Sequence, residues 1–410
     1  MGGDFLAQVV VVGGGPGGMM AAIAASKNNK VVLIEKNNKL GKKLFITGKG
    51  RCNVTNGKDI SEFFDYIPTN SYFLYSALYT FTNEDTIKFF KENGVELKIE
   101  RGDRVFPKSD KSSDIIKAFE KALIENNIEI RLGVAVKDLK VKNRKITSVI
   151  LDSGEYIECD NVILATGGAS YPQTGSNGDG FRFGKKLGHN IVPIKPSLVP
   201  IEIDEDWVKE VQGLSLRNIQ LTVLNSNNKV IFKEQGEMLF THFGISGPLC
   251  LSASSLIKSE GKYKIVINLK PALSEKELDL RIQKDFLKYN NKDFKNALND
   301  LFPQKLIPIM INLSKIPENQ KVNSITKEQR RYFVNLISNL TMNVKGLRAI
   351  DEAIVTSGGI DTKEIDPSTM KSKVISNLSF AGEIIDVDAY TGGYNVQIAI
   401  STGFIAGSKI

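Results

Sequence analysis

The first residues able to do chemistry are the glycines from Gly13 to Gly18, which follow the pattern G-x-G-x-x-G. They lie between an apolar run over residues 9–12 and a run of small and apolar residues. This order predicts a buried strand, a tight turn and a helix, the context in which the pattern binds the pyrophosphate of a dinucleotide. Gly13 then makes the turn, Gly15 lets the backbone approach the phosphates, and Gly18 lets helix and strand pack closely. The N–H groups and partial positive charge of the helix N-terminus face the phosphates.

A carboxylate follows the next predicted strand. The apolar run over residues 31–34 ends at Glu35, about twenty residues beyond the glycines. A carboxylate in this position accepts hydrogen bonds from the ribose of adenosine. Because it favours a free 2′-hydroxyl over a 2′-phosphate, we expect FAD or NAD rather than NADP here. The basic residues that follow, Lys42, Lys43, Lys49 and Arg51, are expected to offset the charge of a bound pyrophosphate.

Three further glycine-rich segments have the composition of cofactor loops. Residues 46–56, which include Thr47, Gly48, Cys52 and Asn53, combine flexible glycines with hydrogen-bond donors, as a loop that wraps an extended dinucleotide requires. Residues 165–168 end a predicted buried strand in small residues that allow backbone contact. Residues 381–397 bring a strand end, a glycine turn and a helix start together. A helix N-terminus aimed at a flavin pyrimidine ring would stabilise the negative charge of its reduced form.

The motifs also restrict how electrons can reach the cofactor. No second G-x-G-x-x-G follows a predicted strand, and no C-x-x-C is present for disulfide chemistry. A nicotinamide must therefore bind transiently over the flavin, or the electrons must come from the substrate. Asp386 and Asp388 lack the further ligands of a calcium loop, so we expect them to brace the flavin loop and expect no metal.

Few catalytic side chains are expected, because a flavin itself performs the hydride transfer. His189 and His242 are the only histidines, and His242 is the better candidate for a proton donor or substrate anchor. The alternative is that His242 satisfies backbone groups in its glycine-rich turn. Cys52 is expected to be a small buried residue rather than a redox thiol.

The composition of the chain limits the classes of partner that we expect it to bind. The chain has 410 residues and a net charge of +8, but its lysines are interleaved with acidic residues, so we expect a small-molecule substrate rather than nucleic acid. Three separated cysteines favour a reducing, cytoplasmic compartment. No apolar stretch is long enough to span a bilayer, so no membrane partner is expected.

Changes in residue pattern along the chain predict an α/β fold in several segments. Residues 1–193 are expected to form the first part of a Rossmann-like dinucleotide-binding domain, which residues 356–410 complete. Alternating apolar residues predict a β-rich insert over residues 194–272, to which residues 341–355 return a strand. Residues 273–340 have helical spacing and predict a helical sub-domain within that insert.

Motifs spread over nearly the whole length carry a family resemblance. Besides G-x-G-x-x-G, they are T-G-K-G-R-C-N at 47–53, R-V-F-P at 104–107, A-T-G-G at 165–168, F-T-H-F-G-I-S-G-P at 240–248, and A-G-E-x-x-D-V-D-x-x-T-G-G-Y-N at 381–395. With these, the chain resembles the bacterial flavoproteins called YhiN-like or BaiN-like, whose relatives include aminoacetone oxidases and bile-acid-type enone reductases. The resemblance implies non-covalent FAD, and a fold of the glutathione-reductase and fumarate-reductase type with a β-barrel-like domain and a helical domain. The residues it implies as FAD contacts are Gly15, Pro16, Gly17, Glu35, Lys36, Arg51, Asn53, Val136, Thr166, Gly167, Gly382, Glu383, Asn395 and Val396.

Three functions follow from these patterns. The first is an FAD-dependent oxidoreductase in which flavin N5 exchanges hydride with an organic substrate, most simply as an NAD(P)H-linked reductase of an activated C=C bond. The second is an amine or aminoketone oxidase that passes its electrons to O₂. The third, from another class, is a flavin-dependent RNA-modifying or RNA-binding protein.

Overall fold

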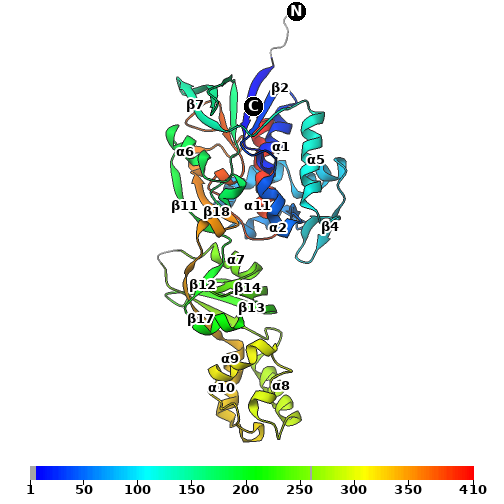
Figure 1. The fold of residues 1–410 in the computed structure, drawn as a ribbon, viewed down its shortest axis with the longest axis vertical. Coiled ribbons are helices and arrows are strands. Elements are labelled where there is room, and N and C mark those ends of the chain that lie inside the picture. The colour runs from blue at the N-terminus through cyan, green and yellow to red at the C-terminus, as the bar shows by residue number, and fades with distance from the viewer. Residues whose placement is uncertain (1–5, 259–260) are drawn as a thin grey trace, which may run out of the picture. The chain divides into compact units, whose positions relative to one another are not determined.

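The computed structural model describes residues 6–258 and 261–410, which divide into two compact units. The first unit contains residues 6–197 and 349–410, and the second contains residues 198–348. Each unit is described by itself below (Figure 1). Among the described residues, no helix is both long and apolar enough to cross a membrane.

A five-stranded parallel sheet forms the centre of the first unit. Its order is β19–β10–β1–β2–β6, and its strands are Leu378–Phe380, Asn161–Leu164, Ala7–Val12, Asn29–Glu35 and Glu129–Leu132. The inner strands are continuous apolar runs because helices or loops cover both faces of the sheet, and Val9, Val10 and Val11 are fully buried. This sheet confirms the predicted Rossmann-type α/β fold.

Two glycine-rich helices cross each other against this sheet. They are α1 (Pro16–Ala25) and α11 (Tyr394–Ser408), and Figure 1 shows them side by side. A Cβ atom at Gly403 would lie 2.2 Å from the Gly17 carbonyl oxygen, and one at Gly407 would lie 2.2 Å from that of Ala21. The absence of side chains therefore lets the two backbones touch, which places the C-terminal part of α11 beside the first turns of α1.

The remaining elements of the first unit surround the central sheet. Two small antiparallel sheets are β3–β5–β4 and β7–β8–β9, and β11 pairs with β18. The strands of the first sheet are β3 (Thr55–Asn56), β4 (Leu97–Glu100) and β5 (Arg104–Pro107), and those of the second are β7 (Val136–Lys142), β8 (Lys145–Leu151) and β9 (Tyr156–Glu158). The remaining pair is β11 (Ile191–Ser197) and β18 (Val355–Ile360). The helices are α2 (Lys42–Gly50), α3 (Tyr75–Thr80), α4 (Asn83–Glu92), α5 (Ser112–Glu125) and α6 (Asp179–Lys186). Apolar residues recur at helical spacing over residues 112–126, and the structure forms α5 there, which buries Ile115, Phe119 and Leu123.

The second unit contains a closed antiparallel barrel. Its order is β12–β15–β14–β13–β16–β17, from strands Ile201–Ile203, Gly244–Ser246, Val230–Phe240, Ser215–Asn225, Tyr263–Asn268 and Leu340–Leu347. A short helix, α7 (Pro248–Ser254), follows β15. Along β13, Leu216, Ile219, Leu221 and Val223 are buried, so the alternation of the sequence reflects one face toward the barrel interior.

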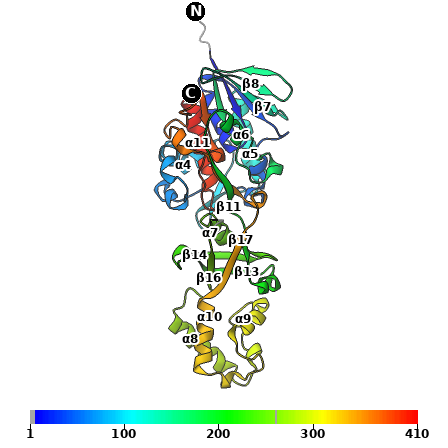
Figure 2. The ribbon, with the colours of Figure 1, turned by 90° about the vertical axis from the view of Figure 1, so that its left-hand side faces the viewer.

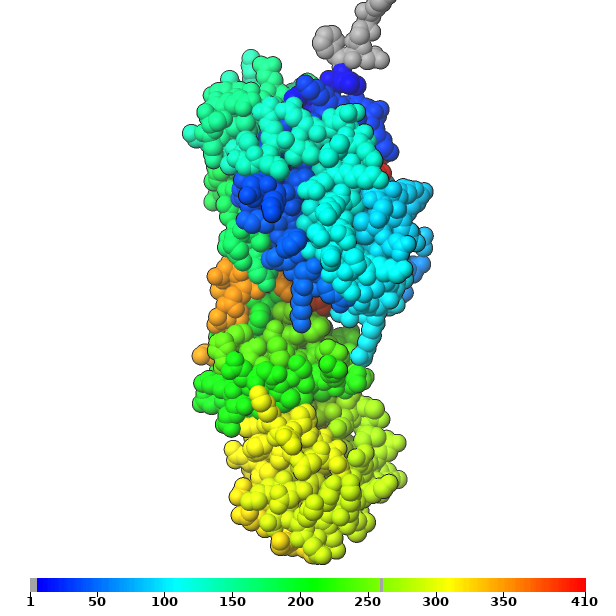
Figure 3. Space-filling model, turned by 45° about the vertical axis from the view of Figure 1, so that its right-hand side comes forward, coloured from blue at the N-terminus to red at the C-terminus, as the bar shows by residue number. Residues whose placement is uncertain are grey.

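A helical segment, residues 269–339, is inserted between β16 and β17. It contains α8 (Glu275–Lys288), α9 (Ile307–Ser314) and α10 (Lys327–Ser338), of which α8 and α10 lie side by side in Figure 2. The segment has its own apolar core, which includes Ile282, Phe294 and Phe333. Figure 3 shows it in yellow as a closely packed group of side chains.

Candidate cofactor-binding site

Four predicted cofactor segments meet at one edge of the parallel sheet. The glycine turn follows β1, Glu35 ends β2, Thr166 and Gly167 follow β10, and Gly382 follows β19. Because these strands are parallel, their carboxyl ends lie on the same side. The strand β1 is flanked by β2 and β10, so the chain reverses its winding direction there, which is where open α/β sheets bind ligands.

The three glycines of the first motif are required for different reasons. Gly13 has φ +112°, and a Cβ atom on it would lie 2.3 Å from the Ala165 carbonyl oxygen. A Cβ atom on Gly18 would lie 1.8 Å from the Gly13 carbonyl oxygen, so Gly18 allows helix and turn to pack. A Cβ atom on Gly15 would meet no atom within 4 Å. Gly15 thus faces open space, as the backbone of a pyrophosphate cradle must.

The helix that starts at this cradle has free N–H groups to offer. Gly15 is the N-cap of α1, no side chain caps the helix, and its first turn holds no acidic residue. The first N–H groups of a helix have no intrahelical partner. Together with the helix dipole they favour an anion beside Gly15, so the arrangement fits the phosphates of a dinucleotide.

The Glu35 carboxylate is fixed by the backbone around it. Its Oε2 accepts a hydrogen bond from the Gly14 N–H at 2.7 Å, and its Oε1 accepts from the Asn37 N–H at 2.8 Å and the Asn37 side chain at 2.7 Å. The residue is only 9% exposed. An ionised carboxylate has about four acceptor sites, so capacity remains for ribose hydroxyls. The N–H of Val134 donates a hydrogen bond to the Glu35 carbonyl at 3.1 Å. Val136, another predicted cofactor residue, follows two positions later, at the start of β7.

Two predicted cofactor residues have side chains that are engaged elsewhere. The Lys36 ammonium donates to Asp179 at 2.7 Å and to Asn177 at 2.6 Å. The Arg51 guanidinium pairs with Asp110 at 2.7 Å and also with Glu100, which raises its pKa. Neighbouring carboxylates thus neutralise the side-chain charges of Lys36 and Arg51.

The loop before Asn53 has an unusual backbone. Helical geometry ends at Thr47, and Gly48, Lys49 and Cys52 adopt left-handed conformations with φ of 58°, 60° and 60°. Non-glycine residues rarely adopt this conformation, and such residues cluster at functional sites. Cys52 is fully buried, and burial raises the pKa of its thiol to about 12. It is therefore a packed thiol rather than a thiolate.

Unpartnered polar atoms provide a test of whether the site fits a polar cofactor. In the described part of the chain, four buried side-chain atoms lack a hydrogen-bond partner: Asn53 Oδ1, Thr86 Oγ1, Thr166 Oγ1 and Asp388 Oδ1. Buried polar atoms are normally paired. Two of the four belong to residues expected to contact FAD, and a third lies on the loop before α11. The site residues therefore fit a cofactor with several hydroxyl and ring N–H groups.

The start of α11 is joined to the Asn53 loop. A Cβ atom on Gly393 would lie 2.3 Å from the Thr55 carbonyl oxygen and 2.9 Å from Asn53 Oδ1. The Asn395 amide donates to the Ala389 carbonyl at 2.7 Å and accepts from its N–H at 3.0 Å. These contacts hold the N-terminus of α11, with Val396 in its first turn, beside the loop that carries Asn53.

A half-buried network fastens the Gly382 turn. The Glu383 carboxylate accepts hydrogen bonds from Lys43 at 2.7 Å, from the Thr356 N–H at 2.7 Å and from Ser170 at 3.1 Å. Sequence reasoning assigned Lys43 to pyrophosphate charge and missed both Ser170 and Thr356. The structure shows why residue 168 is a glycine, because a Cβ atom there would lie 2.3 Å from Thr356 Oγ1. The network ties α2, β18 and the loop after β10 to the predicted cofactor residues.

Comparison with known proteins agrees with this geometry. Residues 7–409 match the model of the family described as the HI0933-like protein Rossmann domain. The chain belongs to the HI0933-like family. Its members include FAD-dependent oxidoreductases, so the protein is an FAD-dependent oxidoreductase.

Two relatives with different substrates match most of the chain. It is 30% identical over 379 residues to a 3-dehydro-bile acid delta(4,6)-reductase of Clostridium scindens, covering 91% of each protein. It is 29% identical over 372 residues to a ribosomal RNA dihydrouridine synthase of Escherichia coli, covering 90% of this chain and 89% of the relative.

Solved structures share the fold at low sequence identity. A flavocytochrome c3 fumarate reductase in an open conformation has a TM-score of 0.52 at 18% identity, covering 100% of this chain and 78% of that one. A quinol–fumarate reductase has a TM-score of 0.50 at 16% identity, covering 98% and 70%. These likenesses agree with the fumarate-reductase type of fold expected from the sequence.

Not all predicted residues belong to this cluster. His242 is exposed and lies in the second unit between β14 and β15, so its catalytic role stays a prediction. The other histidine, His189, is buried and bonded on both ring nitrogens, by Glu364 and Ser372 at 2.9 Å each. The desolvation of burial lowers the pKa of His189, and its role is structural.

The two aspartates before α11 brace the loop in different ways. Asn70 donates to both the carboxylate and the carbonyl of Asp386, whose pKa is raised by burial. Asp388 accepts from Ser197 at 2.6 Å through Oδ2. Within residues 6–258 and 261–410, no group of three or more His, Cys, Asp or Glu side chains is placed to hold a metal.

Proposed function

We propose that the protein is an NAD(P)H-linked, FAD-dependent reductase of a carbon–carbon double bond conjugated to a carbonyl group. This chemistry is common to the two relatives. A 3-oxo bile acid with double bonds at positions 4 and 6 is an extended enone, and the C5=C6 bond of uridine is conjugated to the C4 carbonyl. In both, hydride adds to the carbon far from the carbonyl and a proton adds to the adjacent carbon.

The observation that carries the proposal is the open cradle at Gly15. It lies on the same sheet edge as Thr166, and the buried loop of Asn53 adds a second free acceptor near α11. Bound there, FAD would supply the hydride acceptor and donor. Gly15 and the first N–H groups of α1 would hold its phosphates, Glu35 its ribose, and the N-terminus of α11 would stabilise charge on the reduced ring.

The reduction consumes one proton per turnover, and we assign its delivery to a side chain. His242 is the proposed source because His189 is buried with both ring nitrogens bonded. Cys52 is a poor candidate, since burial raises the pKa of its thiol to about 12 and leaves it fully enclosed. A nicotinamide would act by transient binding, because the sequence has a single G-x-G-x-x-G after a strand.

Anaerobic stopped-flow spectroscopy of the FAD-loaded protein tests the proposal in two half-reactions. NADH or NADPH is expected to bleach the flavin, and 2-cyclohexen-1-one is expected to restore its colour, whereas cyclohexene, which has no conjugated carbonyl, is not. His242→Gln is expected to slow reoxidation while leaving the reductive half-reaction intact. Bleaching by aminoacetone but by neither nicotinamide would overturn the proposal in favour of an oxidase.

A further inference from the structure

The positive charge of the protein is concentrated in the helical segment. Residues 269–339 contain thirteen Lys and Arg against eight Asp and Glu, so this sixth of the chain carries five of the eight net positive charges. The concentration is invisible in the whole sequence, where basic and acidic residues alternate. It becomes evident once the bounds of β16 and β17 delimit the segment.

The acidic residues of the segment are already engaged within it. Five form ion pairs: Asp279 with Arg330, Asp285 with Arg281, Asp293 with Lys321, Asp300 with Lys288, and Glu318 with Lys295. The other three, Glu275, Glu277 and Glu328, lie in the first turns of α8 and α10, where the helix dipole favours them. Little acidic surface is left to repel a polyanion.

Six exposed lysines of this segment form no ion pair with a carboxylate in the described part of the chain: Lys276, Lys284, Lys292, Lys305, Lys315 and Lys327. Lys305 donates instead to the Gln212 carbonyl at 3.1 Å. Two of the six lie over aromatic rings. The Lys292 ammonium is 4.7 Å from the centre of the Tyr289 ring, and that of Lys315 is 5.7 Å from the centre of the Tyr332 ring. Free cations beside accessible rings are the elements with which proteins bind single-stranded nucleic acid.

The outer face of α8 combines these lysines with apolar side chains. Lys276, Leu280, Lys284 and Leu287 recur at helical spacing, and the two leucines are 57% and 75% exposed. The opposite face of α8 is buried in the core of the segment. A lipid-anchoring helix needs its main apolar face free to enter the bilayer. Because α8 has already buried that face, a membrane is a poor occupant.

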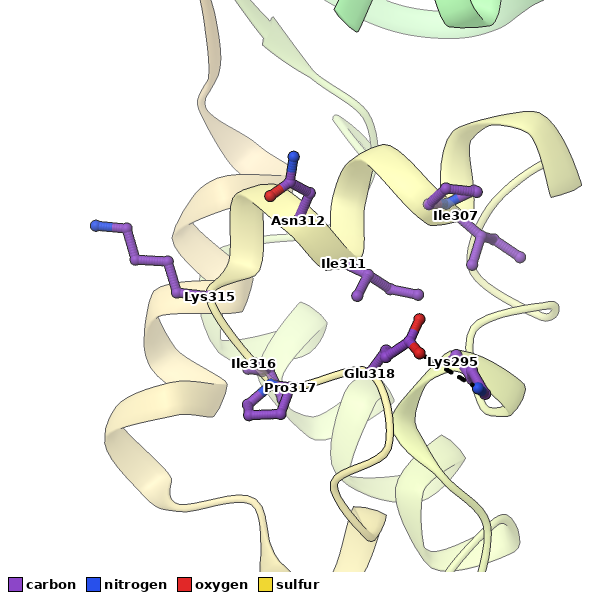
Figure 4. A pocket seen from close by; sticks show the side chains of 9 residues that line it. Lys295, Ile307, Ile311, Asn312, Lys315, Ile316, Pro317 and Glu318 are labelled. Carbon is purple, nitrogen blue, oxygen red and sulfur yellow. Dashed lines mark hydrogen bonds and ion pairs between the residues drawn. The ribbon is translucent and has the colours of Figure 1, made fainter.

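A recess of about 570 Å³ lies on the same segment (Figure 4). Ile307, Ile311 and Ile316 give it an apolar lining, while Asn312 and Lys315 stand at its rim. In Figure 4 the Ile311 side chain points toward the Lys295–Glu318 pair, and Lys315 projects away from the recess. The apolar floor of the recess suits the face of an unpaired base.

We infer that the helical segment is a docking surface for single-stranded RNA, held by Lys276, Lys284, Lys292 and Lys315. The inference rests on the proposed function, because uridine in RNA carries a double bond conjugated to a carbonyl group. It assigns phosphate binding to this segment and the reduction to the FAD unit.

Fluorescence anisotropy of the FAD-loaded full chain with a labelled oligouridine of about 20 nucleotides tests the inference. The test variant changes Lys276, Lys284, Lys292 and Lys315 to Gln. The control variant changes four exposed lysines elsewhere, Lys27, Lys117, Lys142 and Lys229, so that the net charge falls equally. Flavin absorbance and the thermal unfolding midpoint check that both variants are folded.

The wild type is expected to bind with an affinity that falls steeply with salt. Each phosphate contact on a single strand contributes about 0.7 to the slope of log K against log salt, so the test variant should lose about 3 from that slope and on the order of tenfold or more in affinity. The control variant should retain the wild-type slope. Equal losses in the two variants would overturn the inference, as would absence of oligouridine binding at about 50 mM salt.

Two further measurements separate the sources of failure. Vesicles of phosphatidylcholine with phosphatidylglycerol are expected not to bind, and binding of vesicles in place of oligouridine would overturn the inference in favour of a membrane surface. Reoxidation of the reduced flavin by 2-cyclohexen-1-one is expected to be the same in the test variant and the wild type. If that reaction is absent while RNA binding depends on the four lysines, the proposed function fails and the docking surface stands.

Discussion

Replacing Gly15 by alanine tests the cofactor cradle, and the same change at Gly18 is its control. Gly15 has φ −80° and ψ 178°, which alanine adopts readily, and the added methyl group meets no protein atom within 4 Å. Alanine is a poorer N-cap than glycine, which lowers stability, but it also makes the unfolded chain less flexible, which raises stability. Because the two effects offset each other, the free energy of unfolding should change by at most about 0.5 kcal/mol. At Gly18 the methyl group would lie 1.8 Å from the Gly13 carbonyl oxygen, and overpacking of this kind costs about 1–3 kcal/mol or more.

Gly15→Ala, which should hardly change the stability of the protein, should weaken FAD binding strongly. A methyl group on Gly15 occupies the space through which the phosphates approach, and each lost hydrogen bond to a charged group is worth about 1.5–3 kcal/mol. The Kd for FAD should therefore rise roughly 10- to 100-fold in Gly15→Ala. Urea unfolding of the apoprotein by circular dichroism and FAD titration by flavin fluorescence measure the two quantities. An unchanged Kd, or a loss of stability in Gly15→Ala equal to that in Gly18→Ala, would refute the reasoning.

Three further results are expected. Glu383→Gln should lower the free energy of unfolding, measured in urea, by about 1–3 kcal/mol because it breaks the network with Lys43. The same change at the exposed Glu96 should have no effect, and equal effects of the two changes would contradict the role of the network. Because burial lowers the pKa of His189, its contribution to stability is complete above the unfolded pKa of about 6.5 and is lost as the pH falls through the folded pKa. The urea midpoint should therefore fall below that pH, and His189→Gln should flatten the profile; an unaltered profile would exclude His189 as the cause. A thiol reagent at pH 8 should label none of the three buried cysteines until urea is added, and native labelling of Cys52 would contradict its burial.

The sequence predicted the elements whose signals are local. The glycine turn before α1, the apolar strand ending at Glu35 and the amphipathic α5 depend on residues close in the chain, and the structure shows each of them. The parallel sheet and the closed barrel agree with the fold that the family motifs implied. Local periodicity and glycine chemistry are sufficient for features of this kind.

What the sequence could not reveal depends on pairs that are distant in the chain. Lys43 and Glu383 are 340 positions apart, and nothing in either neighbourhood indicates that they form an ion pair. Arg51 follows the glycines of its loop like a phosphate ligand, but the hairpin of β4 and β5 supplies carboxylates that draw its side chain away. The basic character of the helical segment was also hidden, because charge concentration depends on where a folded segment begins and ends.

The close crossing of α1 and α11 has a consequence for synthesis. Gly17 and Gly403, whose backbones touch, are 386 positions apart in the sequence. A ribosome adding about 5–20 residues per second makes the intervening chain in roughly 20–80 s. For that time α1 lacks the helix that covers it, and the cradle at Gly15 lacks the N-terminus of α11. A nascent chain stalled before Tyr394 would therefore emerge without the complete set of predicted cofactor residues.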